Sequence, residues 1–136
     1  MIEFFIPLEK IPTTTKQQHR VTFRNEKPVF FNTKAIDELE EELTYKLKRY
    51  AQKFVTGEKT PLKVVVWWRF NYKRGHNNGE YKTTRPDLDN MFKLPADIMT
   101  KLGFWHDDSQ LSDVQLIKTW DKNSGIYIKI EELTHE

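Results

Sequence analysis

The segment 62–72 places the strongest constraint on the fold. It reads LKVVVWWRFNY, and its apolar residues fall on both sets of alternating positions. One face of an extended chain would carry Val64, Val66, Trp68, Phe70 and Tyr72. Val65 and Trp67 would lie on the other face, and apolar residues on both faces are typical of a strand inside a sheet. We therefore predict a central strand that is buried on both sides for part of its length.

Shorter strands are predicted on either side of this segment. At the N-terminal end they cover residues 2–8, 21–23 and 28–31. Near the C-terminus, a strand at 112–120, a tight turn at 122–125 and a strand at 125–133 predict an antiparallel hairpin. The last strand shows clear alternation, with isoleucines at 126, 128 and 130 between polar or aromatic residues.

Two segments have helical periodicity. Apolar residues at steps of three and four predict a helix over 33–55, with Thr33 as N-cap and Gly57 as its end. Its first half is acidic and its second half basic, which complements the helix macrodipole, so we interpret the acidic run as helix stabilisation. A second helix is predicted over 88–102 with Gly103 as its stop. Pro95 removes one backbone donor, which predicts a kink or break near 92–94.

Together these elements predict a small α+β domain, a mixed sheet with two main helices, covering residues 1–136 as one domain. The chain has no cysteine, which excludes disulfides and thiolate metal ligands. The apolar run at the N-terminus is too short for a membrane span and has no basic leader before it. We therefore expect neither a signal peptide nor a membrane anchor.

Positive charge gathers just before the acidic part of the chain. Residues 58–85 contain seven basic and two acidic side chains, a local net charge of +5. This pattern suits an enzyme that acts on a polyanion, although a solvated strand edge and loop would have the same composition. The predicted DNA contacts here are Lys73, Arg74, Lys82 and Arg85. Lys16 and Arg20 are further candidates, with an ordinary surface loop as the alternative.

The candidate chemistry lies in two acidic clusters separated by the second helix. The first holds Asp87 and Asp89, followed by Lys93, and the second holds Asp107 and Asp108. Pro86 disfavours a helix before it, so we expect an extended Asp87 and Asp89 at the N-cap or first turn, both facing one ion. Converging aspartates suit Mg²⁺ or Mn²⁺ better than zinc. Such ions activate water and stabilise the leaving oxygen in phosphodiester cleavage, and Lys93 would orient the water or offset phosphoryl charge.

Each feature also has a structural interpretation. An Asp-x-Asp pair at a helix start is often only a cap, and Asp89 with Lys93 is often only a surface ion pair of about 0.3–0.5 kcal/mol. Asp107 and Asp108 would also fit a turn before a strand. The chemistry alone does not distinguish between these two residues as ligands.

The blocks RPDLDN and GFWHDDSQ, with Lys93 and Asp97 between them, resemble the RusA family of Holliday junction resolvases over about 85–118. The resemblance implies a homodimeric, Mg²⁺-dependent, cytoplasmic endonuclease of bacterial or phage origin that nicks two opposed strands of a four-way junction. It implies that Asp87, Asp89 and Asp108 are the metal-binding catalytic carboxylates and Lys93 the catalytic lysine. Asp107 matches a supporting acidic position, and Lys118 a basic one that contacts DNA. The alternatives are a nuclease for flaps, forks or duplex, and a non-catalytic module that binds branched DNA.

Overall fold

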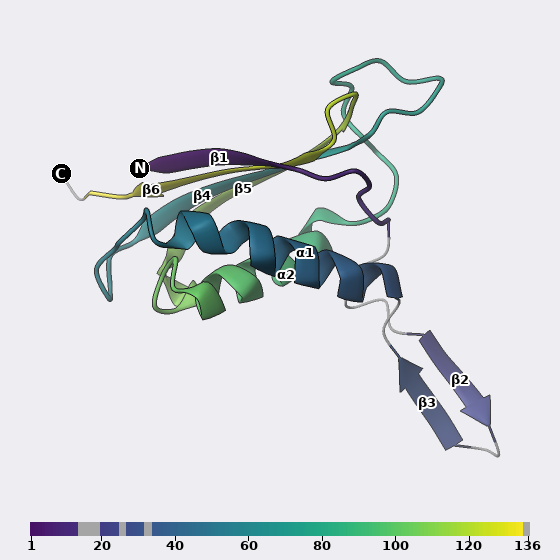
Figure 1. Ribbon diagram of the computed structural model, residues 1–136, viewed down its shortest axis with the longest axis horizontal. Coiled ribbons are helices and arrows are strands. Elements are labelled where there is room, and N and C mark those ends of the chain that lie inside the picture. The colour runs from purple at the N-terminus through teal and green to yellow at the C-terminus, as the bar shows by residue number, and fades with distance from the viewer. Residues whose placement is uncertain (14–19, 25–26, 32–33, 135–136) are drawn as a thin grey trace.

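The computed structural model describes residues 1–13, 20–24, 27–31 and 34–134. Figure 1 shows the order of its elements along the chain. The strands are β1 (Ile2–Pro7), β2 (Arg20–Arg24), β3 (Lys27–Phe31), β4 (Leu62–Asn71), β5 (Leu111–Asp121) and β6 (Gly125–Glu132). The helices are α1 (Lys34–Ala51), α2 (Leu88–Leu102) and the short 3₁₀ helix η1 (Asp108–Gln110).

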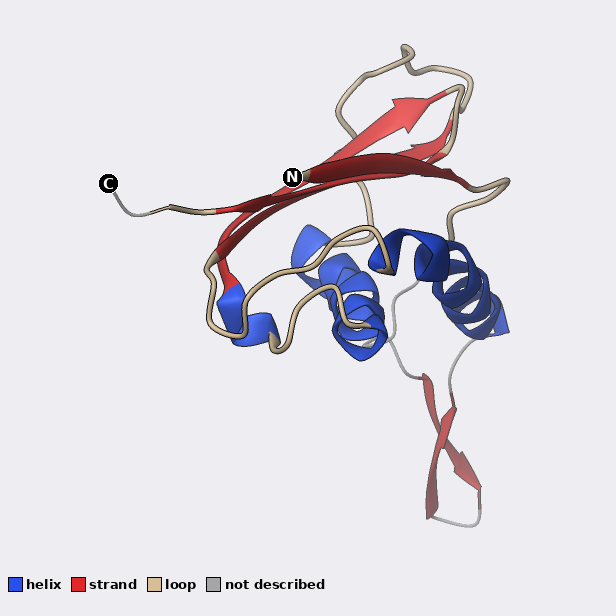
Figure 2. Ribbon diagram, turned by 60° about the vertical axis from the view of Figure 1, so that its left-hand side comes forward, coloured by secondary structure: helices blue, strands red, loops and turns tan. Residues whose placement is uncertain are grey.

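Four strands form the main sheet, in the order β1-β6-β4-β5. The central strand β4 is parallel to β5 and antiparallel to β6, which confirms both the mixed sheet and the central position predicted for it. Strands β2 and β3 pair only with each other and extend away from the sheet, beyond the start of α1 (Figures 1 and 2).

The predicted C-terminal hairpin is wrong. Strands β5 and β6 follow each other in sequence, but β4 lies between them. Residues 122–124 therefore cross the end of β4, where Asn71 Nδ2 donates to Ser124 Oγ at 3.1 Å. The physical reason is that β4 gains most from pairing on both edges, because its faces are apolar, whereas β5 has exposed polar residues that suit a sheet edge.

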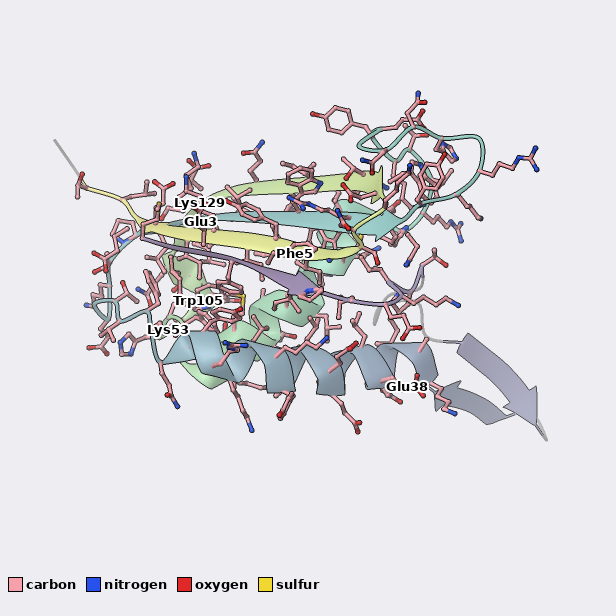
Figure 3. All side chains as sticks on the ribbon, turned by 45° about the horizontal axis from the view of Figure 1, so that its top comes forward. Glu3, Phe5, Glu38, Lys53, Trp105 and Lys129 are labelled. Atoms are coloured by element: carbon pink, nitrogen blue, oxygen red, sulfur yellow. The ribbon has the colours of Figure 1, made fainter. Side chains whose placement is uncertain are left out.

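Both main helices cover one face of the sheet, and no helix of the described residues lies over the opposite face (Figure 2). Val64, Val66 and Trp68 point toward the helices and are at most 2% exposed. Trp105 lies between the sheet and α1 in Figure 3 and is 1% exposed. Val65 and Trp67 on the other face stay partly exposed, so the burial predicted for both faces of β4 is complete on one face only.

Helix α1 is shorter than predicted. It ends at Ala51 rather than at Val55, and the chain then turns so that Phe54 remains buried against the core. Gly57 instead serves a tight turn, since a Cβ there would lie 2.5 Å from Thr60 Oγ1. Thr33, the predicted N-cap, lies outside the described residues.

Helix α2 has the predicted bounds, and Gly103 ends it with a left-handed φ of 86°. The helix is continuous through Pro95, so the predicted break is wrong, whereas the alternative of a kink stays a prediction. One missing donor is tolerated because Leu94, Pro95 and Ala96 are all buried and packing holds the turn in place. Within the ranges described, no helix is long and apolar enough to cross a membrane.

Candidate active site

The start of α2 presents the first two aspartates. Asp87 is the N-cap residue with extended backbone (φ −75°, ψ 139°), as predicted, and Asp89 lies in the first turn. Asp87 makes no side-chain capping hydrogen bond, so the simple capping interpretation fails for its carboxylate. Both side chains are exposed. Two carboxylates at the start of α2 are therefore available to bind a ligand.

Lys93 lies one helical turn beyond Asp89 and is exposed. In the described part of the chain, neither residue takes part in a salt bridge within 4.0 Å. The surface ion pair that would explain them without catalysis is therefore not formed. The Lys93 ammonium group is available to an anionic substrate beside the two carboxylates.

The second cluster contains two aspartates with different roles. Asp107 is the N-cap of η1, and its carboxylate accepts a hydrogen bond from the Ser109 amide at 2.9 Å. That bond stabilises the charged form and lowers the pKa of Asp107. Asp108 has no capping role; its hydrogen bond with Asp107, burial, and the charges of Asp107 and Asp97 raise its pKa. The geometry therefore gives Asp107 a capping role that Asp108 lacks, a difference that the chemistry of the sequence did not reveal.

Gln110 holds this turn in place, a role that the sequence reasoning missed. Its side chain is 6% exposed, and Oε1 accepts from the amides of His106 (2.7 Å) and Asp107 (3.2 Å). Its Nε2 donates to the carbonyl oxygens of Gly57 and Thr60, each at 2.9 Å. The signal was present in the sequence, because Asp107 and Gln110 have the spacing of a capping box.

Replacing Gln110 with Met should therefore destabilise the fold. The change keeps the side-chain size but leaves the carbonyl oxygens of Gly57 and Thr60 and two amides without their partner, so we expect a loss of at least about 2 kcal/mol in unfolding free energy. Urea denaturation measures it. The matched change at exposed Gln115 should stay within about 0.5 kcal/mol of the wild type. Equal effects at both positions would contradict the anchoring role of Gln110.

The two acidic clusters lie beside different parts of α2. Asp108 is influenced by the charge of Asp97, which lies eight residues after Asp89, about 12 Å along a helix axis. Among the described residues, no group of three or more His, Asp or Glu side chains is placed to hold a metal ion. Convergence of both clusters on one ion therefore stays a prediction. Asp87 and Asp89 alone fit Mg²⁺, which commonly binds one or two carboxylates and completes its shell with water and substrate oxygens.

The predicted DNA-binding residues whose side chains are described fall into an exposed group and a buried or half-buried group. Lys73, Arg74 and Arg85 are exposed on the segment between β4 and α2, as a phosphate contact requires. Lys82 is 4% exposed, so it does not fit a direct contact with DNA in this conformation. Lys118 is partly buried and donates to backbone carbonyl oxygens.

The candidates near the N-terminus cannot be placed in the same way. Lys16 lies outside the described residues, as does the side chain of Arg20.

Comparison with known proteins extends the likeness over nearly the whole chain. The sequence profile of the family described as "Endodeoxyribonuclease RusA" matches residues 10–131. The chain belongs to the RusA family. It is 33% identical over 131 residues to a crossover junction endodeoxyribonuclease of Lactococcus phage r1t, covering 96% of this chain and 98% of that protein.

Two further RusA proteins match a shorter region. The crossover junction endodeoxyribonucleases of Escherichia coli K12 and Enterobacteria phage 82 are each 40% identical over 53 residues, 38% of this chain and 44% of theirs. The r1t match shows that membership in the RusA family does not depend on the two acidic blocks alone.

Proposed function

We propose that this RusA-family protein is a crossover junction endodeoxyribonuclease that resolves Holliday junctions by paired symmetric nicks, with Mg²⁺ as cofactor and Mn²⁺ as a substitute. The observation that carries the proposal is the pair of uncapped, exposed carboxylates of Asp87 and Asp89 beside Lys93, in a chain whose relatives are named for this activity. Recombination and repair of DNA in the cytoplasm of a bacterial host are the setting in which such a substrate arises.

Each residue of the site has a role in this reaction. Asp87 and Asp89 would hold the ion through oxygen ligands, with Asp108 as the third catalytic carboxylate. When bound, Mg²⁺ lowers the pKa of a coordinated water and stabilises the departing oxygen. Lys93 offsets charge on the phosphoryl oxygens, where a preorganised cation favours the transition state over the ground state.

Two further features support a branched DNA substrate. The exposed cations Lys73, Arg74 and Arg85 lie on the segment that leads into Asp87, so they would bind phosphates next to the cleaved bond. A homodimer is proposed because a two-fold symmetric enzyme presents equivalent sites to opposed strands of a nearly symmetric junction.

A cleavage comparison tests the function. The purified protein with Mg²⁺ should cut a mobile four-way junction at least about tenfold faster than linear duplex of the same sequence, a discrimination of about 1.4 kcal/mol. A cruciform plasmid should be linearised without an accumulating nicked form, because two nicks occur within one binding event. Equal rates on junction and duplex would favour a general nuclease, faster cutting of flaps or forks would favour those substrates, and junction binding without cutting would favour a non-catalytic module.

A further inference from the structure

Lys118 makes an unusual pair of contacts for a basic residue on a sheet. It lies on the side of β5 that faces the helices, opposite Trp68 of β4 in the sheet register. Its Nζ donates to the carbonyl oxygens of Thr84 at 2.8 Å and Pro86 at 2.7 Å. Those carbonyls come three residues and one residue before Asp87. Lys118 therefore binds the stretch of backbone that delivers Asp87 to the start of α2.

That stretch has little backbone pairing to hold it. The Lys82 amide donates to the Lys118 carbonyl oxygen at 3.1 Å, which ends the pairing of this segment with β5, and α2 begins only at Leu88. Among the described residues, those at 83–86 make no backbone–backbone hydrogen bond. Since the Asp87 side chain does not cap the helix, the direction of its carboxylate depends on how this linking segment is held.

Lys82 packs between the sheet and the same segment. Its buried ammonium group lies 4.3 Å from the ring centre of Trp120 and 5.1 Å from that of Phe70, and it donates to the Thr84 hydroxyl. Burial, followed by the charges of Lys118 and Lys73, lowers the pKa of Lys82. Thr84 is thus held by Lys82 through its side chain and by Lys118 through its carbonyl.

We propose that Lys118 is a positioning residue: by binding the Thr84 and Pro86 carbonyl oxygens it fixes the segment that aims the Asp87 carboxylate. Two of the three donors of its ammonium group are committed to backbone, which leaves little capacity for phosphate. The inference rests on the proposed function only in that Asp87 is taken as a metal-binding carboxylate. It replaces the earlier expectation that Lys118 is a DNA contact.

Three variants of the full-length protein separate these roles. Lys118→Met removes the charge and the donors but keeps the length of the side chain. Lys118→Arg keeps the positive charge and the donors, because a guanidinium can donate to two oxygens at once. Lys122→Met is the matched control, an exposed lysine just after β5.

Four quantities are measured for each variant: the single-turnover cleavage rate at saturating junction and Mg²⁺, the junction Kd in EDTA, the affinity for Mn²⁺ alone by electron paramagnetic resonance, and the ¹⁵N order parameters of the Thr84, Arg85 and Asp87 amides without metal.

A positioning role predicts a specific pattern. Lys118→Met should lower the cleavage rate and the Mn²⁺ affinity by about 10–100-fold, as loss of an outer-shell partner does, while the junction Kd stays within about threefold. The order parameters should fall from about 0.85 toward 0.6. Lys118→Arg should recover most of the cleavage rate and order, and Lys122→Met should match the wild type throughout.

Other results would overturn the proposal. A junction Kd weakened more than tenfold with an unchanged saturating rate makes Lys118 a DNA contact. A slower rate with unchanged order parameters makes it act in the reaction itself, and lower order with an unchanged rate removes it from the aiming of Asp87. If Lys118→Met is unfolded at the assay temperature, Lys118→Gln, which retains one amide donor group, takes its place in all four measurements.

This outcome is distinguishable from failure of the proposed function. If the wild type does not prefer junctions, the rates are compared on the DNA that it does cut. The Mn²⁺ affinity and the order parameters need no DNA, so they test Lys118 in either case.

Discussion

Asp89→Asn is expected to bind a four-way junction at least as tightly as the wild type and to cut it at least about 100-fold more slowly in Mg²⁺. The substitution keeps the shape of the side chain and its place in the first turn of α2 but removes the negative charge. Binding should persist because one repulsive charge beside the phosphates disappears. Cutting should fall because an amide is a poor ligand for a hard cation. Junction cleavage under single-turnover conditions, with electrophoretic binding in EDTA, measures both effects.

Asp113→Asn is the matched control for this experiment. Asp113 is exposed on β5 and lies 4.0 Å from Lys63, so losing its charge removes only a weak surface pair. This control should cut at the wild-type rate. Unchanged cutting by Asp89→Asn would exclude Asp89 from the site, and loss of junction binding would assign it to substrate binding or folding instead.

The elements of the fold were largely predictable, but their arrangement was less so. The period-two and helical patterns of β4 and α2 predict both correctly, because each pattern reflects which side chains the core must bury. Strand order is a different matter. Consecutive strands are usually neighbours, which made a β5–β6 hairpin the natural expectation. Instead β4, which lies far from both strands in sequence, takes the position between β5 and β6.

The site shows the same division between local and long-range information. Pro86 disfavours helix at Arg85 before it, so the position of Asp87 at the start of α2 followed from its neighbours in sequence. The burial of Lys82 could not be predicted, because it depends on the segment 79–82 returning along the edge of β5 and placing the ammonium group by Trp120. A basic residue in this charged segment could either contact DNA or pack in the protein interior, and only the packing distinguishes these two roles.

The two neighbouring aspartates of the second cluster should respond in opposite ways to the same chemical change. Asp108→Asn is expected to cut a junction at least about 100-fold more slowly with unchanged stability, because its exposed side chain caps nothing. Asp107→Asn is expected to keep cutting within about threefold but to be less stable than the wild type, because an amide oxygen is a weaker acceptor for the Ser109 amide than a carboxylate. Single-turnover cleavage and urea denaturation of both variants measure these effects.

Each variant is the control for the other, since both remove one charge from the same turn. A general electrostatic effect of that charge would slow both variants equally, and a general loss of fold would destabilise both. If Asp107→Asn is the slow variant and Asp108→Asn the unstable one, the roles assigned from the capping geometry are reversed. The expected result, a slow Asp108→Asn and a destabilised Asp107→Asn, would show that the capping box formed with Gln110 fixes Asp107 in the fold and leaves Asp108 to the substrate. That separation explains how adjacent identical residues serve one turn without sharing one function.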